Sequence, residues 1–179
     1  MFNFAMNIAS DRAHGWLTLK RLSPMPVAAY LAAKFATSMV FALIIIVLLY
    51  SVAALGAGVK LGLGQWLLLA LILLPGTLPF ALIGLLLGLT LSDKAAPGVV
   101  NLIYLPMAFL SGLWMPLSFL PPIFQQLSWI WPSYHLSELG LKVLGMGQGH
   151  SFWLHLGMLI LTSGLLALVT VKMFRRQIR

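Results

Sequence analysis

Hydrophobic residues fall into long uninterrupted blocks along this chain, without the regular polar interruptions of an amphipathic helix or strand. The first block, residues 35–57, reads FATSMVFALIIIVLLYSVAALGA and contains no charged residue. Three more blocks occupy residues 65–91, 98–115 and 152–171, and the third block is the shortest. A helix crosses a bilayer core with about 20 mostly apolar residues. The pattern therefore predicts an all-α integral membrane protein, with four transmembrane helices in one membrane domain (residues 1–179).

Composition supports a lipid-exposed surface. Hydrophobic residues make up 61% of the chain and charged residues 8%, whereas a soluble domain carries about 25% charged residues. The net charge of +8 does not indicate nucleic-acid binding, because the basic residues lie in short segments between apolar blocks. The chain has no cysteine, which excludes disulfides and thiol chemistry.

The distribution of Lys and Arg predicts the orientation. Nine of the eleven lie before residue 35, in the short connection 92–97, or in the tail 172–179. Because basic residues are enriched in cytoplasmic loops, we expect both ends of the chain to be cytoplasmic in a cell membrane.

Residues 116–151 are rich in proline and aromatic residues and nearly uncharged. They are expected to form external helices at the outer leaflet.

Residues 10–26 predict a short amphipathic helix on the cytoplasmic side. Ser10 or Asp11 could cap its start, and Pro24 and Pro26 would end it. Apolar and basic side chains alternate between them. Such a helix lies on the lipid surface or docks into another protein, and the residues alone leave both open.

The second block contains two pairs of residues that affect helix packing. Gly84 and Gly88 are spaced so that another helix can approach closely. Pro75 and Pro79 remove backbone donors and are expected to kink the helix.

The sequence offers little catalytic chemistry. The predicted spans contain no Asp, Glu, Lys or Arg, and their one histidine, His155, is interpreted as an interfacial residue. His135 and Glu138 are spaced to touch on a helix, but two residues do not make a metal site. No G-x-x-x-x-G-K-[ST] loop or catalytic motif occurs. We expect no catalytic residues, no metal site and no ATP hydrolysis by this chain.

Three segments carry a resemblance to a known family. The run Asp11-Arg12-Ala13-His14-Gly15, followed by Leu-rich residues and Ser23-Pro24, is similar to the cytoplasmic segment of that family, the ABC-2 type permeases of bacterial exporters. Residues 101–121, NLIYLPMAFLSGLWMPLSFLP, resemble its fifth span and the following turn. Tyr134-His135-Leu136 resembles its outer helices before the last span.

The resemblance implies a fold, partners and site residues. Family members have six spans, work as homodimers or heterodimers, and sit on two ABC ATPase subunits that bind ATP and Mg. It assigns ATPase coupling to a set of cytoplasmic residues (Asp11, Arg12, Gly15, Leu17, Leu19 and Lys20) and an outer gate region to Ser111, Gly112 and Pro116. The implied function is export of a hydrophobic or amphipathic substrate such as a drug, lipid or antibiotic.

The chain also departs from the family pattern. It has Asp11 where members usually have Glu, and Trp16 where a small residue is usual. Residues 1–9 resemble the end of a preceding span, so we expect the first two spans of the family to be missing. Alternative functions are a membrane scaffold or regulatory subunit, a secondary carrier or channel, and a membrane enzyme. The absence of charged residues in the spans opposes a carrier.

Overall fold

The computed structural model describes residues 1–14, 27–112, 114–147 and 150–178, and these residues form helices joined by short connections, with no strand among them. The long elements are α1 (Phe2–Ala13), α3 (Val27–Ser51), α4 (Leu63–Gly76), α5 (Leu78–Thr90), α6 (Ala96–Phe109) and α9 (Phe152–Ile178). A π-helical turn, η1 (Val52–Gly56), continues α3. A 3-10 turn, η2 (Leu117–Phe119), and two helices, α7 (Pro122–Ser128) and α8 (Pro132–Val143), lie between α6 and α9. This is the all-α architecture that the sequence predicts.

Three helical stretches in the described part of the chain are long and apolar enough to cross a membrane: Ala32–Gly56, Leu63–Thr90 and Phe152–Phe174. The prediction of a fourth span at 98–115 differs from the structure, because α6 ends at Phe109. Its 14 residues extend about 21 Å, against a hydrocarbon core of about 30 Å. Gly112 has a φ of 78°, which an α-helix cannot contain, so the apolar residues beyond Phe109 belong to a turn.

Two other predicted boundaries shift outward. The first span was expected to begin at residue 35, but α3 begins at Val27. The predicted tail 172–179 is helical as far as Ile178, because α9 continues beyond the apolar block. Lys and Arg are good helix formers, so the change to basic residues ends the apolar surface without ending the helix.

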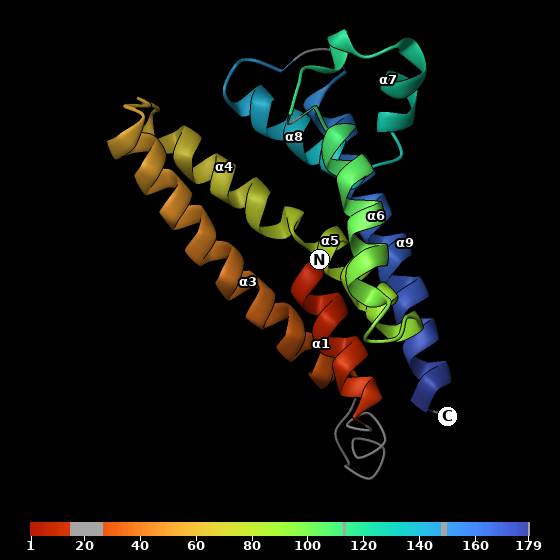
Figure 1. The fold of residues 1–179 in the computed structure, drawn as a ribbon. Helices are drawn as coiled ribbons and strands as arrows, with labels where there is room; N and C mark the ends of the chain where they lie inside the picture. The colour runs from red at the N-terminus through yellow and green to blue at the C-terminus, as the bar shows by residue number, and fades with distance from the viewer. Residues whose placement is uncertain (15–26, 113, 148–149, 179) are drawn as a thin grey trace.

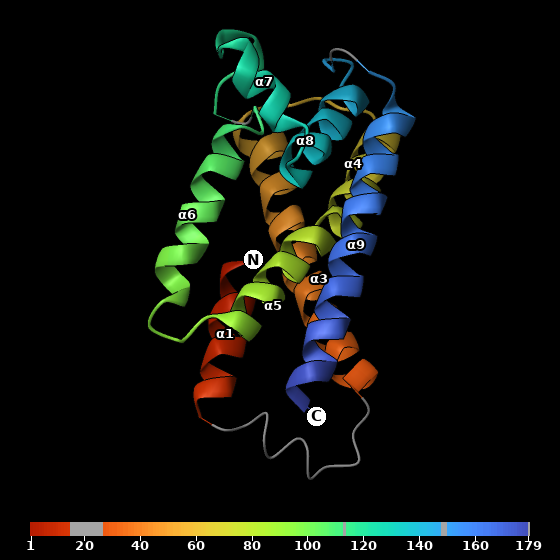
Figure 2. The same cartoon turned by 90° about the vertical axis from the view of Figure 1, so that its right-hand side faces the viewer.

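The helices form a bundle whose two ends differ (Figures 1 and 2). One end, which we call the base, holds the C-terminus and the end of α1; α7 and α8 lie at the opposite end, which we call the crown. α9 runs between them and packs against α8 near the crown and against α5 nearer the base. The first turn of α8 (Pro132 to His135) is buried within the protein.

α3 stands apart from most of the bundle, and large apolar side chains along it are exposed. Phe41, Ile45 and Leu49 are each more than half exposed. An apolar surface of this length is stable against lipid and costly in water. The chain is accordingly a multi-pass membrane protein.

Candidate functional site at the base of the bundle

Two glycines of α5 bring α1 into close contact. A Cβ built on Gly84 would lie 2.3 Å from the carbonyl oxygen of Met1, and one on Gly88 would lie 2.8 Å from both the carbonyl oxygen of Ala5 and the Cβ of Ile8. No side chain fits at these distances. The glycine pair that the sequence singles out therefore lies against α1.

A small hydrophobic core holds this contact in place. Ile8, Leu85, Leu89 and Phe174 are buried together, so that α1, α5 and α9 share one cluster. Phe4, Phe35 and Val171 pack around it. α1 is thus fixed to two of the helical stretches that are long enough to span a membrane, Leu63–Thr90 and Phe152–Phe174.

Arg12 connects α1 to the end of α5. Its guanidinium donates hydrogen bonds to the carbonyl oxygens of Leu89 and Leu91, the latter at 3.2 Å. The last carbonyls of a helix have no partner within the helix and carry the negative end of its dipole. A cation placed there donates hydrogen bonds to these carbonyls and complements the negative end of the dipole. Arg12 of α1 therefore acts as a C-terminal cap of α5, from 77 residues away in sequence.

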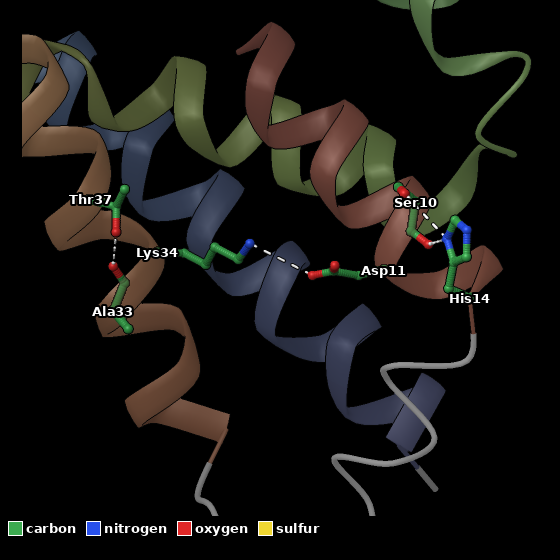
Figure 3. A network of polar contacts seen from close by, with 6 residues as sticks. All are labelled: Ser10, Asp11, His14, Ala33, Lys34 and Thr37. Atoms are coloured by element: carbon green, nitrogen blue, oxygen red, sulfur yellow. Dashed lines mark hydrogen bonds and ion pairs between the residues drawn. The ribbon is translucent and has the colours of Figure 1, made fainter.

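Asp11 connects the same turn of α1 to α3 (Figure 3). Its carboxylate lies 3.7 Å from the Nζ of Lys34, and both side chains are about 30% exposed. Exposed ion pairs contribute about 1 kcal/mol or less. On the other side of the helix, the Nδ1 of His14 lies 2.9 Å from the carbonyl oxygen of Ser10.

The structure corrects the predicted start of the cytoplasmic helix. Ser10 and Asp11 do not cap a new helix, since both lie inside α1. The packing of Ala5, Ile8 and Ala9, all buried, extends α1 past the residues that the sequence marks as a helix start. The predicted coupling residues Gly15, Leu17, Leu19 and Lys20 lie outside the described residues.

Pro75 and Pro79 flank the break between α4 and α5. Pro75 lies in the last turn of α4, Pro79 in the first turn of α5, and Thr77 joins the two helices. The hydroxyl of Thr77 donates to the carbonyl oxygen of Leu74 at 2.7 Å. Just before the break, a Cβ on Gly76 would lie 2.3 Å from a methyl carbon of Leu136, so α4 closely approaches α8.

The predicted outer gate residues lie at the crown, between α6 and η2. Ser111 is buried, Gly112 turns the chain with its positive φ, and Pro116 is exposed before η2. The turn is joined to α8, because the hydroxyl of Ser137 donates to the carbonyl oxygen of Ser111 at 2.7 Å. One helical turn earlier, Ser133 donates to the carbonyl oxygen of Met107 at 2.9 Å. The sequence did not predict these two hydrogen bonds, because a serine in an apolar segment does not indicate which carbonyl it will contact.

Two histidines at the crown were not predicted as a pair. His155, which was expected to be interfacial, is fully buried, and its Nδ1 lies 3.0 Å from the Nδ1 of His135. Within the described ranges, no three His, Cys, Asp or Glu residues are grouped to hold a metal ion.

Comparison with known proteins identifies the family of the chain. The sequence model of the ABC-2 family transporter proteins matches residues 1–172. A protein of Bacillus subtilis (strain 168) named "Putative transport permease YvfS" is 29% identical over 177 residues, which are 99% of this chain and 71% of that protein. No solved structure matches at a significant level. A helical multi-pass membrane protein with this match is a transporter membrane subunit, and the chain belongs to the ABC-2 transporter family.

Proposed function

We propose that the chain is the membrane permease subunit of an ATP-driven ABC exporter. It would form the path for a hydrophobic or amphipathic substrate such as a drug, lipid or antibiotic. A separate ABC ATPase would bind ATP and Mg and supply the energy, since this chain has no phosphate-binding loop. Family membership and the name of the relative support the transporter class, and we further propose that two permeases assemble as a homodimer or heterodimer.

The link between Arg12 and α5 carries the proposed mechanism. The segment 10–26, proposed to dock on the ATPase, begins in the last turn of α1, whose Arg12 bonds to the end of α5. The glycine contact leaves no space between the two helices. A displacement of the docked segment would therefore move α5, which is half of the span Leu63–Thr90. ATP-driven motion would reach the transport path without covalent chemistry in this chain.

Charge supports a cytoplasmic base. Lys34 lies near the base end of α3, and Lys172 and Arg176 lie in the last turns of α9. Lys94 lies in the connection between α5 and α6, also at the base. This enrichment follows the positive-inside pattern and favours placing both ends of the chain in the cytoplasm.

Purification from the native membrane in mild detergent tests whether an ATPase subunit accompanies the protein. We expect an ATP-hydrolysing subunit to co-purify, and Leu19→Asp to lose it because a charge would enter the apolar face of the helix that the sequence predicts there. Arg176→Ala, which removes an exposed base-side charge, is the matched control and should retain it. If no ATPase accompanies the unaltered chain, the permease proposal loses its mechanism and a scaffold becomes the better assignment.

Arg12→Ala separates docking from transmission. The variant should still bind the ATPase, because Arg12 faces α5, but ATP-driven efflux of a hydrophobic dye from vesicles should fall at least tenfold. Efflux equal to that of Arg176→Ala would contradict the proposed transmission through α5.

A further inference from the structure

The joint between α8 and α9 at the crown is built on two buried imidazole rings. His135 and His155 are both fully buried, with their Nδ1 atoms 3.0 Å apart. The other ring nitrogen of His135, Nε2, lies 2.9 Å from the carbonyl oxygen of Trp129. The ring of Trp129 covers the pair, with its centroid 5.7 Å from that of His135 and 5.9 Å from that of His155.

These contacts fix where the protons lie. A carbonyl oxygen only accepts, so the Nε2 of His135 carries its proton and donates to Trp129. In a neutral ring the Nδ1 of His135 is then an acceptor. The Nδ1 of His155 must donate to it, which leaves the Nε2 of His155 as a bare acceptor. That Nε2 is buried and has no hydrogen-bond partner in the described parts of the chain.

Charged and titratable groups lie around the pair, on α8 and just before α9. His150, which precedes α9, lies against the Trp129 ring with centroids 4.7 Å apart, and both His150 and Lys142 act electrostatically on His155. On α8, burial and the charge of Glu138 raise the pKa of Tyr134. Burial lowers the pKa of His135, although its bond to Trp129 opposes this shift. α4, α5 and α7 contain no titratable side chain, and α6 contains Tyr104.

We propose that His135 and His155 form a proton-sensitive latch at the crown, in which the neutral pair holds α8 against α9 and proton uptake releases it. The first proton can enter only at the Nε2 of His155, where it would create a buried cation without a partner. Such a charge costs several kcal/mol, so protonation requires the joint to open and admit water. A second proton, on the Nδ1 of His135, would set two N–H groups against each other.

The sign of the pH dependence follows from this arrangement. The closed joint excludes the proton and the open joint accepts it, so the closed state is favoured at high pH and is lost as the pH falls below about 6.5, the ordinary imidazole value. For one proton excluded from the closed state, the equilibrium constant for opening rises about thirtyfold between pH 7.5 and pH 5. The latch does not depend on the proposed ATPase partner.

Long-range ¹H–¹⁵N NMR of the ¹⁵N-histidine-labelled chain in lipid nanodiscs tests the proton arrangement directly. At pH 8 we expect His135 as the Nε2–H tautomer and His155 as the less common Nδ1–H tautomer, with His135→Gln and His155→Gln used to assign the signals. An Nε2–H tautomer for His155 would overturn the proton assignment and with it the latch.

Labelling of a buried cysteine tests the opening, and the absence of native cysteine makes a single substitution specific. Leu139→Cys places a thiol in the fully buried core between α4, α8 and α9. Gln126→Cys on exposed α7 is the control for the intrinsic effect of pH on thiol reactivity. The ratio of maleimide labelling rates, Leu139→Cys over Gln126→Cys, should rise by about thirtyfold from pH 7.5 to pH 5.

Adding His155→Gln to both cysteine variants should reduce that rise to less than about threefold. The glutamine amide can turn its nitrogen toward a neutral His135 or its oxygen toward a protonated His135, so the contact persists at either pH. A ratio that does not change with pH in the unaltered pair, or a rise that persists with His155→Gln, would overturn the proposal. Should Leu139→Cys fail to fold, the NMR measurement on the unsubstituted chain still decides it.

Discussion

Gly88 provides a strong test of how α1 is held. Replacing Gly88 with alanine would place a Cβ 2.8 Å from the carbonyl oxygen of Ala5 and from the Cβ of Ile8, and 3.2 Å from the Cα of Ala5. These are backbone atoms or atoms fixed to the backbone, so no side-chain rotation relieves the contact. α1 must move away by about 0.6 Å to reach an ordinary contact distance of about 3.4 Å.

The cost of Gly88→Ala is the difference between two effects. Overpacking of a well-packed core costs about 1–3 kcal/mol, whereas alanine in place of glycine within a helix gains about 0.5–1 kcal/mol. Gly164 in α9 is the matched control, since a Cβ there meets nothing within 4 Å. We expect Gly164→Ala to stabilise the protein. The free energy of unfolding of Gly88→Ala should be lower than that of Gly164→Ala by about 1–3 kcal/mol.

The assay is unfolding by increasing mole fraction of SDS in mild detergent, followed by circular dichroism for both variants and the unsubstituted chain. Equal stability of Gly88→Ala and Gly164→Ala would show that α1 does not pack on α5 as described, and it would remove the structural basis for transmission through Arg12.

Three further substitutions test individual contacts. Arg12→Ala should destabilise the protein by about 1.5–3 kcal/mol through loss of charged hydrogen bonds, measured by the same SDS titration, whereas Arg176→Ala should have no measurable effect. Ser133→Ala should cost about 1–2 kcal/mol because it removes the partner of the Met107 carbonyl oxygen; Ser163→Ala, whose hydroxyl bonds only within its own helix, is the comparison, and equal losses would refute the cross-helix role. Lys34→Met should cost at most about 1 kcal/mol, and a loss that is the same in high salt as in low salt would show that the ion pair with Asp11 does not account for it.

The sequence predicted those elements that depend on apolar length. α3, α9 and the pair α4–α5 correspond to the predicted blocks, because a charge-free run of this length has few alternatives in lipid. α6 was predicted too long, since its end is set by the backbone turn at Gly112 and the apolar residues continue unchanged through it. Hydropathy does not distinguish an apolar helix from an apolar turn.

Part of the candidate site was predictable from residue spacing. Gly84 and Gly88 were recognisable because glycines at this spacing allow another helix to approach closely, but the sequence did not show which helix they contact. Arg12 was expected in the cytoplasmic segment, but its bonds to the end of α5 depend on a contact between residues 77 positions apart. The His135–His155 pair depends on a contact across 20 positions, and neither residue has a distinctive sequence neighbourhood.

The break at Thr77 divides the central span between two groups of helices. α4 packs on α8 near the crown, α5 packs on α1 near the base, and α9 contacts both groups. If Thr77 served as a pivot, one half of the span would rotate while the other half kept its neighbours. α5 has 13 residues and is about 20 Å long, so a rotation of about 10° about Thr77 would move its far end by about 3 Å. Under the proposed mechanism the span would work as a lever that turns at Thr77, and Arg12 would hold the end of α5 farthest from that point.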